Sequence, residues 1–236
     1  MKQALDLFSG TESSTKAFAE DPDWQVTTVD VSQKFDPDIC IDILELTPED
    51  FGKDFDFIWA SPPCQKFSVA ALYRHWDEKL LPKKQEVVES VRLAYHTIWL
   101  IRELDPEHWF LENPRGMLRK VLPFKPEGTV TYCQYGFDYM KPTDLYGHHP
   151  ASMKYKKCKA GGSCHQSSPR GANTFRDVTS SRAKGLQDVT SGFSGQDSKH
   201  LGETAAERSR VPYELSKQIF EAIQNPGKQE KQSTLM

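Results

Sequence analysis

The sequence lacks any uninterrupted apolar run close to the roughly 20 residues of a membrane-spanning helix, which argues against an integral membrane protein. It has only five cysteines, an odd number with scattered spacing, which argues against a disulfide framework and favours a reducing compartment. Its 15 prolines and 14 glycines exclude a coiled coil or a fibre. No secretory signal precedes the first strand-like run at Ala4. We therefore expect a cytoplasmic, globular protein, working as a monomer with no membrane or obligate protein partner.

The charge is small overall but unevenly distributed. The net charge of the 236 residues is −3, whereas residues 151–200 hold six Lys and three Arg against three Asp and no Glu. The rest of the chain is therefore acidic. A basic segment in an acidic body is typical of contact with a polyanion, although a solvated loop would have the same composition.

Short apolar runs alternate with helical patterns in the first half of the chain, which is typical of βαβ units around a parallel sheet. The expected strands are 4–8, 25–29, 39–43, 55–60, 109–111 and 129–132, and the expected helices are 13–20, 87–101 and 211–223. This order predicts an α/β fold with a doubly wound, Rossmann-like parallel sheet and helices on both faces.

Carboxylates follow three of these strands at the edge where such folds bind nucleotide-like cofactors. The segment Asp6-Leu7-Phe8-Ser9-Gly10 ends the first strand and opens a helix, so its backbone amides suit a cofactor, although one glycine is also compatible with an ordinary turn. Asp30 ends the second strand about 20 residues later, the position of a ribose-binding carboxylate. Asp42 and Ile43 close the third and could contact an adenine ring.

Two further segments place reactive groups at the same edge. Ser61-Pro62-Pro63-Cys64-Gln65 follows the fourth strand, and its prolines hold Cys64 in a rigid polar loop, which favours a nucleophile over an inert buried thiol. Glu112-Asn113-Pro114-Arg115-Gly116 ends the next strand, where a partly buried carboxylic acid can protonate a ring nitrogen. Together they form a nucleophile-plus-acid pair.

These motifs, in this order, resemble those of the DNA cytosine-5 methyltransferases. The resemblance covers residues 4–146 and 207–224, and its compact form is similar to a subgroup found in phages. An amino-group methyltransferase would place an aromatic residue where Cys64 stands. The resemblance implies a methyltransferase sheet that uses S-adenosylmethionine, with a small irregular insertion. Residues 1–146 and 203–224 would form the catalytic domain, residues 147–202 a basic target-recognition insertion, and residues 225–236 a disordered tail.

The resemblance also implies the roles of single residues. Cys64 would attack C6 of a cytosine flipped out of double-stranded DNA, and Glu112 would protonate N3, so that C5 takes the methyl group. The residues expected to bind the cofactor are Asp6, Phe8, Ser9, Gly10, Thr11, Asp30, Val31, Asp42, Ile43, Ser61, Pro62 and Ser209. Those expected to contact the nucleic acid near the site are Pro63, Gln65, Ser68, Asn113, Arg115, Gln134 and Lys141.

The basic insertion would position the protein on DNA through phosphate contacts. The residues predicted to make them are Lys154, Lys156, Lys157, Lys159, Arg170, Arg176, Arg182 and Lys184. Because about 55 residues can reach few base edges, we expect a target of about two to four base pairs.

Some features depart from the family pattern. Thr11, Glu12 and Ser13 replace further glycines of the cofactor loop, and Tyr139 stands where a basic residue would help to orient Cys64. These departures leave two alternatives open, a non-catalytic DNA-binding homologue and an enzyme acting on structured RNA. A pure binding module, however, has no use for a nucleophile.

The cysteines and histidines of the insertion match no common zinc pattern. Cys158, Cys164 and His165, with Cys133, His148 and His149 nearby in sequence, are compatible with a zinc site, but the spacing favours unpaired surface thiols. We therefore predict no metal.

Overall fold

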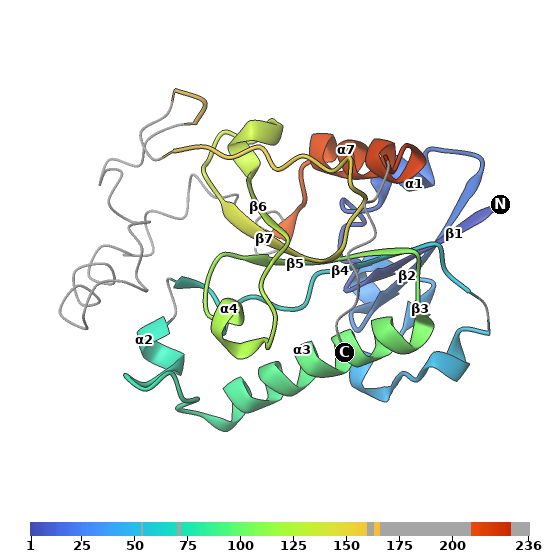
Figure 1. The fold of residues 1–236 in the computed structure, drawn as a ribbon. Helices are drawn as coiled ribbons and strands as arrows, with labels where there is room; N and C mark the ends of the chain where they lie inside the picture. The colour runs from blue at the N-terminus through green and yellow to red at the C-terminus, as the bar shows by residue number, and fades with distance from the viewer. Residues whose placement is uncertain (53, 70–71, 160–162, 166–208, 228–236) are drawn as a thin grey trace, which may run out of the picture.

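The computed structural model describes residues 1–52, 54–69, 72–159, 163–165 and 209–227. A seven-stranded sheet in the order β3-β2-β1-β4-β5-β7-β6 forms its centre (Figure 1). The strands are β1 (Lys2–Leu7), β2 (Trp24–Asp30), β3 (Ile39–Cys40), β4 (Phe57–Ala60), β5 (His108–Pro114), β6 (Gly128–Thr131) and β7 (Pro142–His148). The first five are parallel, whereas β7 runs antiparallel to both of its neighbours, β5 and β6.

Helices cover both faces of the sheet. α1 (Lys16–Ala19) and α7 (Tyr213–Gln224) lie side by side on one face, and α3 (Gln85–Leu104) and α4 (Leu118–Val121) lie on the other (Figure 1). The remaining elements are α2 (Leu72–His75) and the 3-10 turns η1 (Gln33–Phe35), η2 (Ile43–Glu45), η3 (Pro48–Asp50) and η5 (Tyr132–Tyr135). The predicted Rossmann-like fold with helices on both faces is confirmed. No helix in the described part of the chain is long and apolar enough to span a membrane.

The core has two layers because the side chains of a strand alternate between the two faces of the sheet. In β4, Ile58 and Ala60 pack in the layer under α3, while Phe57 and Trp59 pack in the layer under α7. All four side chains are completely buried, as expected for a central parallel strand. α7 contributes Leu215, Ile219 and Ile223 to its layer, which anchors a segment distant in sequence.

Two expected elements are shorter in the structure. The strand predicted over 39–43 ends at Cys40, because the Asp42 side chain accepts the Leu44 amide at 3.0 Å and starts η2 instead. The helix predicted over 13–20 is reduced to α1. The hydroxyls of Ser14 and Thr15 donate to the Asp6 carboxylate, and these two residues lie before the helix.

The ordered core also extends past the predicted boundary at residue 146. β7 continues to His148, and the chain then follows the α7 layer, where Met153 is buried and Gln218 donates to the Lys154 carbonyl at 2.6 Å. The Thr131 amide donates to the Lys156 carbonyl at 3.0 Å, which fastens this segment to the end of β6. The sequence pattern did not indicate this extension, because the apolar residues of the segment are spaced irregularly along an extended chain. Residues 166–202 of the predicted insertion, 203–208, and 228–236 of the predicted tail lie outside the described residues.

Candidate active site

The register of the central strands brings three chain segments to one edge of the sheet. Leu7 of β1 pairs with Ala60 of β4, which in turn pairs with Leu111 of β5. The residues that follow, Phe8, Ser61 and Glu112, therefore lie side by side at the carboxyl edge, where open α/β sheets bind their ligands.

The loop that carries Cys64 leaves this edge in a fixed path. The Ser61 amide donates to the Leu7 carbonyl at 3.1 Å, and the Trp59 indole N–H donates to Ser61 Oγ at 2.6 Å. The Cys64 carbonyl then accepts the amides of residues 67 and 68, both at 3.0 Å, which closes a turn. The Cys64 side chain is half-buried.

The loop after β5 clasps the loop of Cys64. The Asn113 side-chain amide donates to the Pro62 carbonyl at 3.1 Å, and the Met117 amide donates to the Phe67 carbonyl at 2.7 Å. At this crossing a Cβ on Gly116 would lie 2.1 Å from the Phe67 carbonyl oxygen, so only glycine fits. Asn113, predicted to contact substrate, is completely buried and instead ties the two loops together.

Glu112 is buried beside a tyrosine and a lysine. Its side chain is 5% exposed, Tyr132 Oη donates to its Oε1 at 2.9 Å, and Lys141 Nζ lies 3.9 Å from the same oxygen. Burial raises the pKa of Glu112 above its usual value, while the positive charge of Lys141 and the Tyr132 hydrogen bond oppose the rise. Such a carboxyl retains a proton to higher pH than an exposed glutamate.

Sequence reasoning missed Tyr132 as a partner of Glu112. The strand pattern over 129–132 indicated burial but not the direction of the hydroxyl. Lys141 was predicted near the site as a substrate contact, and it brings a cation to Glu112. Its ammonium nitrogen also lies 4.5 Å from the centre of the Tyr132 ring, which fixes it further.

Three residues of the predicted cofactor loop have positive φ angles. Phe8, Gly10 and Glu12 have φ angles of 63°, 50° and 56°, the left-handed region that side chains normally avoid. The Gly10 amide donates to Asp30 Oδ2 at 3.0 Å, so the loop lies against the carboxylate that ends β2. Ser9 Oγ is buried without a hydrogen-bond partner in the described structure, which leaves one polar atom to be satisfied by a ligand.

Asp6, predicted to bind the cofactor, instead binds the two residues before α1. Its side chain is completely buried, and its Oδ2 accepts the hydroxyls of Ser14 and Thr15, both at 2.7 Å. Burial raises its pKa to about 7, against the lowering effect of the two hydrogen bonds.

The residues that could contact the adenine ring of the cofactor differ in their exposure. Asp42 is half-buried beside β3, but the Ile43 side chain is only 2% exposed and packs in the core, so it offers no surface to a ring. The Val31 side chain, 69% exposed, provides apolar surface next to Asp30. From the C-terminal part of the chain, the Val211 amide donates to Ser13 Oγ at 2.9 Å, which brings the segment of Ser209 beside the same loop.

The residues predicted to contact nucleic acid divide into groups. Pro63, Gln65 and Arg115 are exposed, and Ser68 half-buried, on the two clasped loops around Cys64. Thr11 is half-buried on the cofactor loop, and Pro62 is buried. Gln134 is directed elsewhere, because its amide nitrogen lies 3.0 Å from Cys164 Sγ. Lys154, Lys156, Lys157 and Lys159 are exposed, whereas Arg170, Arg176, Arg182 and Lys184 lie outside the described residues.

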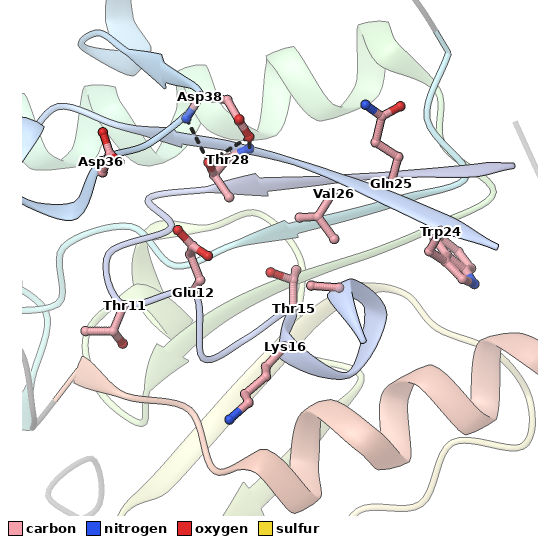
Figure 2. A pocket seen from close by; sticks show the side chains of 11 residues that line it. Thr11, Glu12, Thr15, Lys16, Trp24, Gln25, Val26, Thr28, Asp36 and Asp38 are labelled. Atoms are coloured by element: carbon pink, nitrogen blue, oxygen red, sulfur yellow. Dashed lines mark hydrogen bonds between the residues drawn. The ribbon is translucent and has the colours of Figure 1, made fainter. Parts of the chain in front are cut away.

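A separate depression of about 640 Å³ lies beside α1 and β2 (Figure 2). Neither Cys64 nor Glu112 lines it, and Thr11 is the one predicted cofactor residue that does. In its wall the Thr28 hydroxyl and Asp38 Oδ2 are 2.9 Å apart, which holds the connection from β2 to β3. The reactive pair therefore lies outside this depression.

The chain is similar to known proteins. Residues 5–122, half of the chain, match the family described as C-5 cytosine-specific DNA methylase. A protein of Frog virus 3 (isolate Goorha), described as a probable DNA (cytosine-5)-methyltransferase, is 32% identical over 215 residues, which are 88% of this chain and 94% of that protein. A crystal structure described as a DNA modification methyltransferase encoded within an E. coli prophage matches with a TM-score of 0.44 and 19% identity, over 62% of this chain and 46% of that one. This chain thus spans less than half of that structure. By the family match and the viral relative, the chain belongs to the C-5 cytosine-specific DNA methylases, a family of methyltransferases.

Proposed function

We propose that the protein transfers a methyl group from S-adenosylmethionine to C5 of cytosine in double-stranded DNA through a covalent bond between Cys64 and the base. The observation that carries this proposal is the clasp between two loops at one sheet edge. Asn113 joins the loop of Cys64 to the strand of Glu112, so a nucleophile and a buried acid share one site.

The residues around the first loop fit the cofactor. Ser9 Oγ has no hydrogen-bond partner in the described structure, and Asp30 and Asp42 offer carboxylates for hydroxyl and amino groups. When bound, S-adenosylmethionine supplies a methyl group on a positively charged sulfur. Ile43 is buried, so Val31 is the better candidate for the apolar contact with the adenine ring.

Cys64 and Glu112 would activate a carbon that is otherwise a poor nucleophile. The Cys64 thiolate donates its electron pair to C6, and the electrons of the C5–C6 double bond shift toward C5. Glu112 holds its proton at N3 and offsets the negative charge that develops on the ring. C5 would then take the methyl carbon as the carbon–sulfur bond breaks and leaves a neutral thioether. Loss of the C5 proton to a base would restore the C5–C6 double bond and expel the Cys64 thiolate.

The remaining residues would position the substrate. The base must leave the helix stack to reach Cys64, as other base-modifying enzymes require. Exposed Lys154, Lys156 and Lys157 are suited to phosphate contacts, which set register without reading sequence. Arg115, exposed next to the clasp, would contact the backbone beside the flipped nucleotide.

The test measures transfer of a radiolabelled methyl group from S-adenosylmethionine to duplex DNA of mixed sequence, followed by digestion to identify 5-methylcytosine. We expect activity in the wild-type protein, none in Cys64→Ser, and a loss of about 10²- to 10⁴-fold in Glu112→Gln. Cys40→Ser, at an exposed thiol on β3, is the matched control and should keep full activity.

Three results would contradict the proposal. If RNA received the label and DNA did not, the methyl-transfer chemistry would stand but the substrate would be RNA. DNA binding without transfer to any sequence would favour the non-catalytic alternative. Full activity in Cys64→Ser would exclude the covalent route.

A further inference from the structure

Four metal-binding side chains converge at a place that the methyl-transfer chemistry does not use. Within the described residues, the ligand atoms of Cys133, Cys158, Cys164 and His165 all lie within 4.8 Å of one another. Their spacing in sequence had favoured independent surface thiols, and the structure differs because η5 and the segment after β7 fold together. Cys133 is moreover buried rather than on the surface.

Three of the separations between these atoms match those of a tetrahedral metal centre. Zinc bonds of about 2.3 Å to sulfur and about 2.0–2.1 Å to nitrogen place two sulfurs about 3.8 Å apart and a sulfur and a nitrogen about 3.6 Å apart. Cys164 Sγ lies 3.8 Å from Cys133 Sγ and 3.5 Å from His165 Nδ1, and Cys158 Sγ lies 3.6 Å from the same nitrogen. The 3.1 Å between Cys158 Sγ and Cys164 Sγ is shorter than this spacing, and an ion that bonds both sulfurs would hold them apart.

The protein holds these ligands from two directions. Cys133 lies in η5, directly after β6. Cys158 lies in the segment after β7, and its own amide donates a hydrogen bond to the Thr131 hydroxyl. The Gln134 amide nitrogen lies 3.0 Å from Cys164 Sγ, and such a donor stabilises a metal-bound thiolate. The site is therefore supported by its surroundings, as metal sites in proteins are.

A disulfide explains the cluster less well. The 3.1 Å between the sulfurs of Cys158 and Cys164 is well beyond the bond length of about 2.05 Å, and a disulfide would leave Cys133 and His165 without a role. Three thiolates and one imidazole, with no position left for substrate, are the ligand set of a structural zinc ion. The net charge of −1 on such a centre is favourable beside exposed Lys156, Lys157 and Lys159.

We propose that Cys133, Cys158, Cys164 and His165 bind one zinc ion that fastens the segment after β7 to η5. Because Cys133 follows Tyr132, the ion also fixes the turn that directs the Tyr132 hydroxyl to Glu112. The zinc is structural and takes no part in bond making. It secures the start of the basic segment against the catalytic core.

The first experiment measures the metal content of the full-length protein, purified without chelator or histidine tag, by mass spectrometry of its ions. We expect about one zinc per chain in the wild-type protein and in Cys40→Ser, and less than about one tenth of that in Cys158→Ser and Cys164→Ser. Cobalt in place of zinc should give the intense absorption of thiolate-bound tetrahedral cobalt, which Cys40→Ser keeps and Cys164→Ser loses.

The cluster can be tested separately from the methyl-transfer chemistry. Cys64→Ser should retain its full zinc content. The two proposals can therefore fail separately, because an inactive wild-type enzyme with zinc contradicts only the methyl-transfer proposal and an active enzyme without zinc contradicts only the zinc proposal. Because Cys133→Ser alters a buried position and could unfold the chain, the exposed Cys164 is the decisive variant. Wild-type protein without metal, or a Cys158–Cys164 disulfide found by peptide mapping of protein kept under reducing conditions, would overturn the proposal.

Discussion

At the scale of single residues, two buried carboxyl groups have different tasks. Glu112 is buried beside the clasped loops, whereas the buried Asp6 accepts hydrogen bonds from Ser14 and Thr15. Both have raised pKa values, and burial is the main cause in each. A raised pKa in this protein therefore marks burial first, and function only where a substrate can reach the group.

Asp6 should make the folded state less stable as pH rises. Its pKa is raised from 3.8 to about 7, so between these values the folded chain keeps a proton that the unfolded chain has released. The stabilisation is complete below the lower value and is lost as pH passes the upper one, with about 1.4 kcal/mol per pKa unit as the limit. Asp6→Asn cannot ionise and should lose less stability between about pH 5 and pH 8 in urea titrations. Exposed Glu49→Gln is the control, and equal losses in Asp6→Asn and wild-type protein would contradict this role.

Tyr132→Phe should change the pH dependence of catalysis. Without the hydroxyl at 2.9 Å, the charged form of Glu112 loses a donor, so the pKa of Glu112 rises further. If the protonated acid is the active form, the alkaline limb of the single-turnover rate should move to higher pH. Tyr135→Phe, on the same turn but without a contact to Glu112, should leave this limb in place. A shift to lower pH in Tyr132→Phe would refute the assignment.

At the scale of elements, the proposed function should depend on the crossing of two loops. Gly116→Ala would place a methyl group 2.1 Å from the Phe67 carbonyl oxygen, forcing the loop of Cys64 to move. A displacement of about 1 Å at a catalytic group lowers rates by about 100-fold, which is the loss we expect in methyl transfer. Gly52→Ala, where the new methyl meets nothing within 4 Å, should cost about 1–2 kcal/mol from its positive φ and leave the rate of folded enzyme unchanged. Equal rates in the two variants would contradict the clasp.

α7 should be essential to the fold although it lies far along the chain from the sheet it covers. Leu215 is completely buried in the layer with Phe18, and the Ser216 hydroxyl accepts the Ala17 amide at 3.2 Å. Leu215→Ala should lower the free energy of unfolding by about 2–5 kcal/mol. Exposed Lys217→Ala should change it by less than about 0.5 kcal/mol, and a similarly small loss in Leu215→Ala would show that α7 is only loosely docked.

The central strands and long helices were predictable from sequence because apolar periodicity reports burial directly. The strands that hold Asp6 and Glu112, and the strand before Cys64, were predicted in this way. Parallel topology then brought the ends of these strands to one edge. β7 was not predicted, since its residues are nearly all buried and show no alternation. The early end of β3 was missed because a local bond from Asp42 competes with pairing.

At the scale of the whole molecule, the carboxyl edge of the sheet gathers motifs from most of the chain. The positions of Cys64 and Glu112 followed from strand order and turn residues alone. Tyr132, the loop clasp at Gly116 and the convergence of Cys133 with Cys158 required three-dimensional contacts between segments that share no periodic signal. Sequence thus predicts which groups reach the edge, while packing decides what each of them contacts there.

The most direct test of the proposed reaction uses a DNA duplex containing 5-fluorocytosine with S-adenosylmethionine. Fluorine cannot leave C5 as a proton does, so an enzyme that reacts through Cys64 stays bound to the base and migrates as a protein–DNA adduct on a denaturing gel. The account predicts this adduct for the wild-type protein and for Cys40→Ser, and none for Cys64→Ser. An adduct that persists in Cys64→Ser, or methylation of cytosine by an enzyme that forms no adduct with the fluorinated duplex, would contradict it.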